Sequence, residues 1–182
     1  MQEPHHEPTS GVRASFVRRL VAFLLDGVVL LMAGFALLTL ITVFIGPTVR
    51  LEPESAASPV SEVRTWRVIL NAVLLAALSG VYFVISWSRF GWTPGQRLFR
   101  LAVLEAPRAA GMTPRRAALR WLLLGAPLGL ASALTVSAPL LFLAVLVVSF
   151  TWFSVLVVTT LRSRTGRGLH DRLAGTMVIR RA

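Results

Sequence analysis

The sequence contains no cysteine and no lysine, and it has only three histidines. Without cysteine the chain can form no disulfide framework, thiolate metal site or cysteine nucleophile. Two of the histidines, His5 and His6, are neighbours near the N-terminus, which leaves too few for a histidine metal site, so we expect no metal and no cofactor. Charged residues make up 15% of the chain, against about 25% in an ordinary soluble domain. That scarcity argues against a disordered chain and against a soluble enzyme.

Apolar residues make up 55% of the 182 residues, and they are clustered into long runs. Residues 20–45 contain one ionisable side chain, Asp26, and residues 68–87 contain none. Residues 119–161 contain a single charge, Arg120, near their start. About 20 helical residues cross a hydrocarbon core ~30 Å thick, whereas an amphipathic core helix would show a polar stripe. The sequence therefore predicts an integral membrane protein whose first run is too long for a secretory signal.

The positive charges are all arginines, 19 in number, and their distribution predicts the orientation in the membrane. They are concentrated ahead of the first run, in the loop 89–118 and after residue 161, whereas residues 46–67 carry equal numbers of arginines and glutamates. Because arginine-rich flanks stay in the cytoplasm, we expect both termini and the loop 89–118 to be cytoplasmic and residues 46–67 to lie outside. Attraction to anionic lipids at the cytoplasmic face explains the pI of about 12.0, so we expect no nucleic-acid partner.

Two cytoplasmic termini require an even number of crossings, so the last apolar run should cross twice. Its 43 residues would span about 65 Å as helix, enough for two passes. We predict an all-α membrane protein, a four-transmembrane-helix bundle that follows a disordered tail at residues 1–15. The predicted spans are residues 20–45, 68–87, 119–136 and 139–161. Gly125, Pro127 and Gly129 interrupt the third span, so a re-entrant third segment is the alternative.

Tryptophans flank the predicted spans. Trp66 and Trp87 lie at the two ends of the second span, and Trp121 lies at the start of the third. Tryptophan is enriched at membrane–water interfaces, so we expect these three side chains in an interfacial aromatic belt.

Two short segments are typical of strands. Residues 98–104 are mostly apolar and follow a turn-rich stretch, residues 91–95. Residues 176–180 are β-branched and follow Gly175. We predict that the two segments pair into a small cytoplasmic two-stranded β element, which must lie against the helices or the lipid because an isolated pair is marginal. The alternative is two unpaired interfacial segments.

Asp26 is an acidic residue inside the first predicted span. A charged group at mid-bilayer costs roughly 2.5–3.5 kcal/mol, so this carboxylate needs a partner, a water-filled cavity or a proton. It is either an ion or proton site or a structural anchor paired with an arginine of the inner loop. Arg19 lies about 10 Å away on the same helix face and should extend its guanidinium into the headgroups. Asn71, near the outer end of the second span, should form an interhelical hydrogen bond.

Asp171 is the only other aspartate. The surrounding residues 167–176 predict one helical turn that ends at Gly175, with the carboxylate held among arginines. His170 beside it would allow a general-base role, but no serine nucleophile or metal partner accompanies it. We therefore favour a charge-paired surface turn.

Four segments resemble, in order, motifs of the RDD family of bacterial membrane proteins, which is named for an arginine and two aspartates. The segments are residues 19–27, 91–98, 119–122 and 169–178. The resemblance covers most of an RDD-like membrane domain at residues 16–182 and implies that the three eponymous residues are Arg19, Asp26 and Asp171. It implies supporting roles for Gly91, Thr93, Pro94, Gly95, Arg120, His170, Gly175 and Thr176. The family often has lysine where this chain has Gln96.

The resemblance implies a multi-pass protein of the bacterial plasma membrane, and a transport role has been proposed for some members. Our first hypothesis is a small transporter or transport accessory in which Asp26 exchanges a proton with a cation, with a homo-oligomer enclosing the pathway. The alternative is a non-catalytic assembly or scaffold module that binds other membrane proteins and uses the same polar residues as anchors. We expect no enzyme, because neither nucleophilic nor metal chemistry has enough parts.

Overall fold

The computed structural model describes residues 14–52, 60–63, 65–106, 111–137 and 139–181, and this part of the chain is mostly helical. Four long helices alternate with short elements. The long helices are α1 (Phe16–Ile45), α2 (Thr65–Ile85), α4 (Pro114–Ser137) and α5 (Pro139–Arg162). The short elements are β1 (Val49–Glu52), β2 (Val60–Val63), the π-helical turn η1 (Ser86–Phe90), α3 (Pro94–Leu98), β3 (Leu101–Glu105), α6 (Leu169–Leu173) and β4 (Thr176–Arg180). Most of the tail predicted at residues 1–15 lies outside the described residues.

Three helical segments of the described chain are long and apolar enough to cross a membrane. They are Phe16–Ile45, Thr65–Phe90 and Leu140–Arg162. They coincide with the first, second and fourth predicted spans, and they expose large apolar side chains such as Phe44 and Leu140 on their outer faces. α4 covers the third predicted span as one continuous helix of 24 residues, but it is not among these three. Within the described residues that form long enough segments, composition and length therefore support these three spans.

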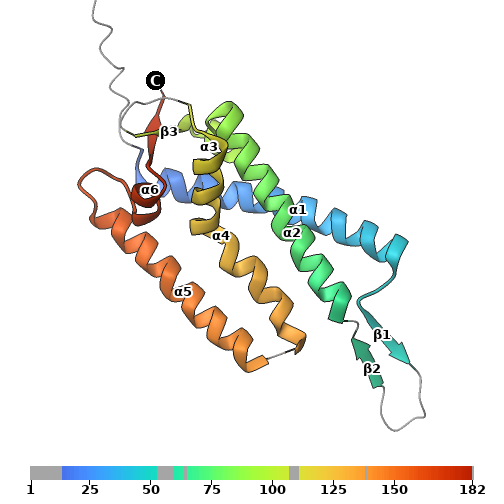
Figure 1. Cartoon of the computed structure of the whole chain (residues 1–182). Coiled ribbons are helices and arrows are strands. Elements are labelled where there is room, and N and C mark those ends of the chain that lie inside the picture. Colours follow the sequence, from blue (N-terminus) through green and yellow to red (C-terminus); the bar gives the residue numbers. More distant parts are fainter. Residues whose placement is uncertain (1–13, 53–59, 64, 107–110, 138, 182) are drawn as a thin grey trace, which may run out of the picture.

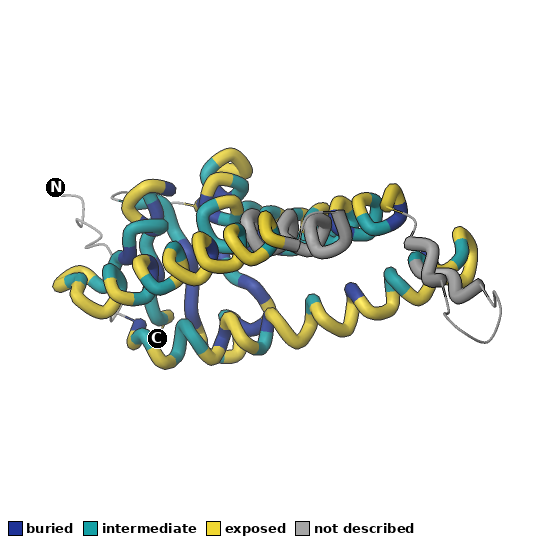
Figure 2. The backbone as a smooth tube through the Cα atoms, turned by 90° about the horizontal axis from the view of Figure 1, so that it is seen from below, coloured by how far each residue is buried: buried dark blue, intermediate teal, exposed yellow. Residues whose placement is uncertain are grey.

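The helices converge at one end of the bundle and separate toward the other. α2 packs along α4, α4 packs along α5, and α1 contacts α2 and α3. Figure 1 shows α3, α6 and the paired strands β3 and β4 gathered at one end, which we call the sheet end, and the hairpin β1–β2 at the opposite, hairpin end. Figure 2 shows α1 running apart from the other long helices over much of its length, while the segment after its far end lies beside the start of α2, where Arg67 donates to the Pro47 carbonyl oxygen.

The predicted β element is confirmed at the sheet end. β3 and β4 pair antiparallel, with Leu101 opposite Arg180 and Glu105 opposite Thr176. The first strand begins later than predicted, because the residues before it form the short helix α3. Leu101 and Val103 are buried against the helices in the main hydrophobic core. Burial of one face against the bundle gives this two-stranded sheet the support that it lacks in isolation.

The hairpin end contains a second antiparallel pair that the sequence analysis missed. β1 and β2 lie within residues 46–67, which we had expected to be a plain loop, and Val49 pairs with Val63. The register also places Arg50 opposite Glu62. Cross-strand pairs of β-branched residues and of opposite charges stabilise antiparallel strands.

The prediction of an aromatic belt is wrong for two of its three tryptophans. Trp87 is only 2% exposed and donates its indole N–H to Gln96 Oε1 at 3.1 Å. Trp121 is half-buried and donates its indole N–H to Ser79 Oγ of α2 at 3.2 Å. Trp66 is exposed, as a belt residue would be. The loop that follows α2 folds back over Trp87 and encloses it, so the ring packs in the core instead of facing an interface.

Candidate functional sites at the sheet end

Asp26 is 1% exposed and accepts hydrogen bonds from three neutral donors. Its Oδ1 accepts from the Tyr82 hydroxyl at 2.7 Å and from the Gly95 backbone N–H at 2.8 Å. Its Oδ2 accepts from the Thr93 hydroxyl at 2.5 Å. The expected arginine partner is therefore wrong for the described residues, because α3 brings a hydroxyl and a backbone amide to this position. We call Asp26, Tyr82, Thr93 and Gly95 the Asp26 cluster.

The short helix α3 holds these donors in place because a reciprocal capping box between Thr93 and Gln96 fixes its first turn. Thr93 is the N-cap and Pro94 takes the first turn, where its missing N–H costs nothing. The Thr93 hydroxyl accepts from the Gln96 backbone N–H, and Gln96 Oε1 accepts in return from the Thr93 backbone N–H at 3.0 Å. The same Oε1 accepts from Trp87, and since a lysine side chain has no acceptor, Gln96 does a task here that the family's frequent lysine cannot do.

Gly95 allows α3 to lie directly on α1. A Cβ at this position would collide with the Ala22 carbonyl oxygen and lie 2.9 Å from Asp26 Oδ1. Gly91, which the family resemblance also singles out, ends the π-helical turn with φ of 71° and accepts from the Val103 N–H at 2.7 Å. That left-handed conformation suits glycine and directs the chain back toward α1.

Asp171 has no exposed surface and is held by cations and neutral donors together. Its Oδ2 lies 3.4 Å from Arg19 Nη1 and accepts from the Gly168 N–H, while its Oδ1 accepts from Arg120 Nη1 and from the Thr176 hydroxyl. The prediction that arginines hold this carboxylate is confirmed. The prediction of a surface turn is wrong, because β4 and two helices cover it. We call Arg19, Arg120, His170, Asp171 and Thr176 the Asp171 cluster.

The prediction that the Arg19 guanidinium extends into the lipid headgroups is wrong, because this group is bonded inside the protein. Its guanidinium donates to the Gly166 carbonyl oxygen at 2.7 Å and to the Val178 carbonyl oxygen at 3.0 Å, in addition to its contact with Asp171. The C-terminal segment folds back over the start of α1 and offers these acceptors. Arg19 therefore ties the first helix to the end of the chain.

The C-terminal signature forms the single helical turn that the sequence predicts. α6 contains His170 and Asp171 and ends before Gly175, whose φ is 65°. The Thr176 hydroxyl follows directly and accepts from Arg120 Nη1. The turn thus places a carboxylate, a hydroxyl and an imidazole around one arginine of α4.

The protonation of the Asp171 cluster follows from its burial and its charges. Burial and the Arg120 guanidinium lower the pKa of His170 to about 4, so this imidazole is neutral at neutral pH. Burial by itself would raise the pKa of Asp171, but the charge and hydrogen bond of Arg120, together with His170 and Arg19, outweigh burial and hold the pKa below its usual value. A neutral imidazole with so low a pKa is a poor general base.

The three eponymous residues do not form one site. Arg19 and Asp171 are in contact, whereas Asp26 has its own partners. Between the two clusters lies Trp87, which bonds to Gln96 on one side and packs under the Arg120 guanidinium, 5.2 Å from its ring centre. In the described ranges, no three His, Cys, Asp or Glu side chains gather into a group that could hold a metal.

Sequence reasoning missed Tyr82 and the acceptor role of Gln96. Tyr82 is the only tyrosine of the chain and lies in an otherwise apolar span, a signal that could have marked it as the partner of a buried polar group. Asn71 lies near the hairpin end, as expected, but the interhelical hydrogen bond predicted for it is not observed: it donates to the Thr48 hydroxyl, in the segment between α1 and β1, at 3.2 Å.

Comparison with known proteins gives one family. The model described as RDD family matches residues 13–175, which include every residue of both clusters except Thr176. No curated protein and no solved structure matches the chain.

Proposed function

Since the chain belongs to the RDD family and is a membrane protein, we propose that it is a non-catalytic membrane module whose buried polar residues are structural anchors. The observation that carries this proposal is that both oxygens of each buried carboxylate accept hydrogen bonds from other parts of the chain. Asp26 joins α1 to α2 and to α3, and Asp171 joins the C-terminal turn to α1 and α4. Each carboxylate links segments that are distant in the chain, which is the task of an anchor.

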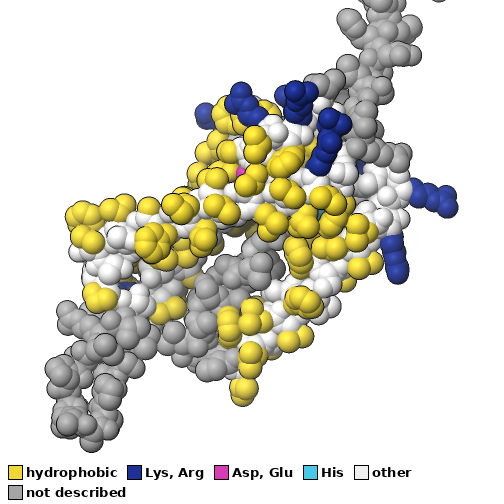
Figure 3. Space-filling model, turned by 180° about the vertical axis from the view of Figure 1, so that it is seen from behind, with side chains coloured by type: hydrophobic (Ala, Val, Ile, Leu, Met, Phe, Trp, Pro, Cys, Tyr) yellow, Lys and Arg dark blue, Asp and Glu magenta, His cyan; other side chains and the backbone are white. Residues whose placement is uncertain are grey.

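We further propose four crossings of the bacterial plasma membrane, with the sheet end in the cytoplasm. Figure 3 shows most of the visible arginines at the sheet end, as expected for a cytoplasmic face. Figure 1 shows α4 running from the sheet end toward the start of α5, so a crossing α4 would supply the missing third span. The apolar outer faces of α1 and α5 then offer surfaces for a partner helix or a second copy.

The absence of native cysteine makes this topology directly testable with single-cysteine variants. An impermeant thiol reagent applied to intact cells should label Ser61→Cys, in β2, and should label Ser163→Cys only after permeabilisation. Ser137→Cys, at the end of α4, should be labelled from outside. If Ser137→Cys reacts only from inside while Ser61→Cys reacts from outside, α4 is re-entrant and the four-span proposal is wrong.

The anchor function is tested by Asp26→Asn in membranes and in reconstituted vesicles. An asparagine offers one acceptor oxygen and places an amide donor against the donors that now surround Asp26, so the accumulated amount of protein should fall. Asn71→Ala is the matched control, because it removes a polar side chain from a span with a single described bond. It should accumulate almost normally.

The alternative function is proton-coupled cation transport with Asp26 as the exchanging group. It is favoured by one observation, the carboxylate inside a helix that can span the membrane. Under this alternative, Asp26→Asn accumulates normally and proton-coupled flux in vesicles disappears. Normal accumulation with lost flux would overturn the anchor proposal.

A further inference from the structure

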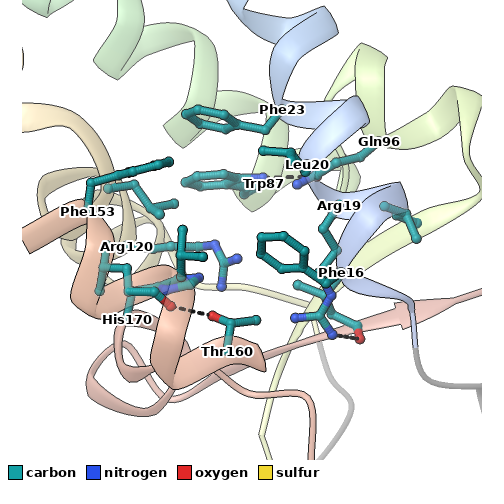
Figure 4. A pocket seen from close by; sticks show the side chains of 15 residues that line it. Phe16, Arg19, Leu20, Phe23, Trp87, Gln96, Arg120, Phe153, Thr160 and His170 are labelled. Atoms are coloured by element: carbon teal, nitrogen blue, oxygen red, sulfur yellow. Dashed lines mark hydrogen bonds between the residues drawn. The ribbon is translucent and has the colours of Figure 1, made fainter. Parts of the chain in front are cut away.

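A cavity of about 770 Å³, its mouth included, opens beside the Asp171 cluster between α1 and α5. Figure 4 shows the guanidinium groups of Arg19 and Arg120, with His170, on one side of it and the rings of Phe23 and Trp87 on the other. The space-filling view of Figure 3 shows the surface hollowed between the same two helices. The cavity therefore has one cationic wall and opens sideways, toward the region that lipid would occupy.

The cationic wall carries more positive than negative charge. Arg19 and Arg120 both contact the single carboxylate of Asp171, and His170 beside them is neutral at neutral pH. The local balance is thus one net positive charge on largely buried side chains. A buried charge without full compensation is unfavourable, and an anion would relieve it.

The same wall contains polar atoms that lack a hydrogen-bond partner in the described structure. They are Nε of Arg19, Nε of Arg120 and Nδ1 of His170. Arg120 is only 4% exposed, so water does not readily satisfy its free N–H. A buried donor without an acceptor costs about 1–3 kcal/mol, and both arginines line this one cavity. The wall therefore has donor capacity for the oxygens of an anionic group.

The rest of the cavity is apolar and continues into the bundle. Phe153 and Val157 of α5 face Phe23 of α1 across it. Phe23, Trp87 and Leu124 also line a second cavity of about 460 Å³ that extends between α1, α2 and α4. The two cavities share these three lining residues, so apolar side chains continue from the arginines toward the middle of the bundle, and we call this lining with its cavity the apolar slot.

We propose that this slot binds one anionic membrane lipid, with its acidic headgroup at Arg19 and Arg120 and an acyl chain between α1 and α5. Guanidinium groups bind phosphate oxygens through paired N–H donors. A soluble anion would satisfy the arginines but would leave the apolar slot without contacts, whereas a lipid satisfies both. The site is independent of the anchor function, because the lipid fills the space beside the Asp171 cluster and replaces none of its bonds.

Val157→Trp tests the proposal by filling the slot from α5 without changing a charge. Val155→Trp is the matched control, because Val155 lies two residues away on the same helix, is exposed and does not line the cavity. In neutral detergent, added phosphatidylglycerol should raise the Tm of the wild type and of Val155→Trp, and phosphatidylcholine should not. Val157→Trp should keep its lipid-free Tm within a few degrees and lose the gain, with affinity for phosphatidylglycerol at least roughly tenfold weaker.

A second measurement uses the wild type alone, so that it holds even if Val157→Trp fails to fold. Native mass spectrometry of protein mixed with equal amounts of the two lipids should retain phosphatidylglycerol in preference, at one molecule per chain. Equal retention of both lipids would overturn the proposal, as would an equal gain in Tm from inorganic phosphate, which would indicate a site for a free anion. A dimer that retains no lipid would show that a second copy covers the slot, and would also overturn it.

Discussion

The two buried carboxylates are stabilised in opposite ways. Asp26, inside a helix that can span the membrane, is surrounded by neutral donors, whereas Asp171, in a short turn at the sheet end, contacts two arginines. Asp26 has no cationic partner among the described residues, whereas the two guanidiniums at Asp171 leave an excess of positive charge. The difference shows that the two aspartates of the family signature have different tasks. Asp26 forms a hydrogen-bonded link within the helix bundle, and Asp171 forms an ionic link that holds the C-terminal segment.

Removing the ionic link should have the largest effect. Asp171→Ala leaves Arg19 and Arg120 buried without their counter-charge, so we expect a loss of about 3–5 kcal/mol in unfolding free energy. Thermal unfolding in detergent, or accumulation in membranes, measures this loss. Arg116→Ala is the control, because the Arg116–Glu105 ion pair is partly exposed and should contribute no more than about 1 kcal/mol. Equal effects of the two variants would contradict the ionic role of Asp171.

Acid should weaken the Asp171 cluster. The pKa of His170 is lowered from 6.5 to about 4 in the folded protein, so the unfolded chain binds this proton first as pH falls. Stability is therefore highest above pH 6.5 and declines between pH 6.5 and about 4, by at most about 3 kcal/mol. Tm measured across this range should follow the decline, and His170→Gln should flatten it. An undiminished decline in His170→Gln would show that another group titrates.

Gln96→Lys should have the smallest effect on stability, because it changes only the contacts around the first turn of α3. Lysine cannot accept from the Thr93 N–H or from the Trp87 indole, so two hydrogen bonds are lost at a cost of about 1–2 kcal/mol. Tm in detergent measures the loss, with Arg97→Lys as the neighbouring control. A Tm that rises on Gln96→Lys would show that the residue frequent in the family finds a better partner here than the described contacts allow.

The long spans and the β3–β4 pair were predictable because each depends on a local pattern. Residues 20–45, 68–87 and 139–161 are apolar enough to mark their helices, and the β-branched run of residues 176–180 marks a strand. The absence of cysteine and the small number of histidines likewise limit which metal sites and nucleophiles the sequence can form. Such features need no knowledge of which segments meet.

The partners of the aspartates could not be predicted in the same way, because they depend on how distant segments dock. Tyr82 and Thr93 lie 56 and 67 residues from Asp26 in the chain. Tyr82 meets it because α2 contacts α1, and Thr93 meets it because α3 lies on α1. The direction of Arg19 likewise depends on the C-terminal segment that folds over α1. The equal numbers of arginines and glutamates in residues 46–67 indicate a charge-balanced loop. They do not reveal that opposite charges face each other across two paired strands, β1 and β2.

A double-mutant cycle on Asp26 and Thr93 tests the anchor role most directly. Asp26→Ala and Thr93→Val each remove one side of the same hydrogen bond between α1 and the loop before α3. If this bond holds the loop to the helix, the losses of unfolding free energy in the two single variants should add up to more than the loss in the double variant, by a coupling of about 1 kcal/mol or more. Additive losses, with no coupling between the two positions, would contradict the account.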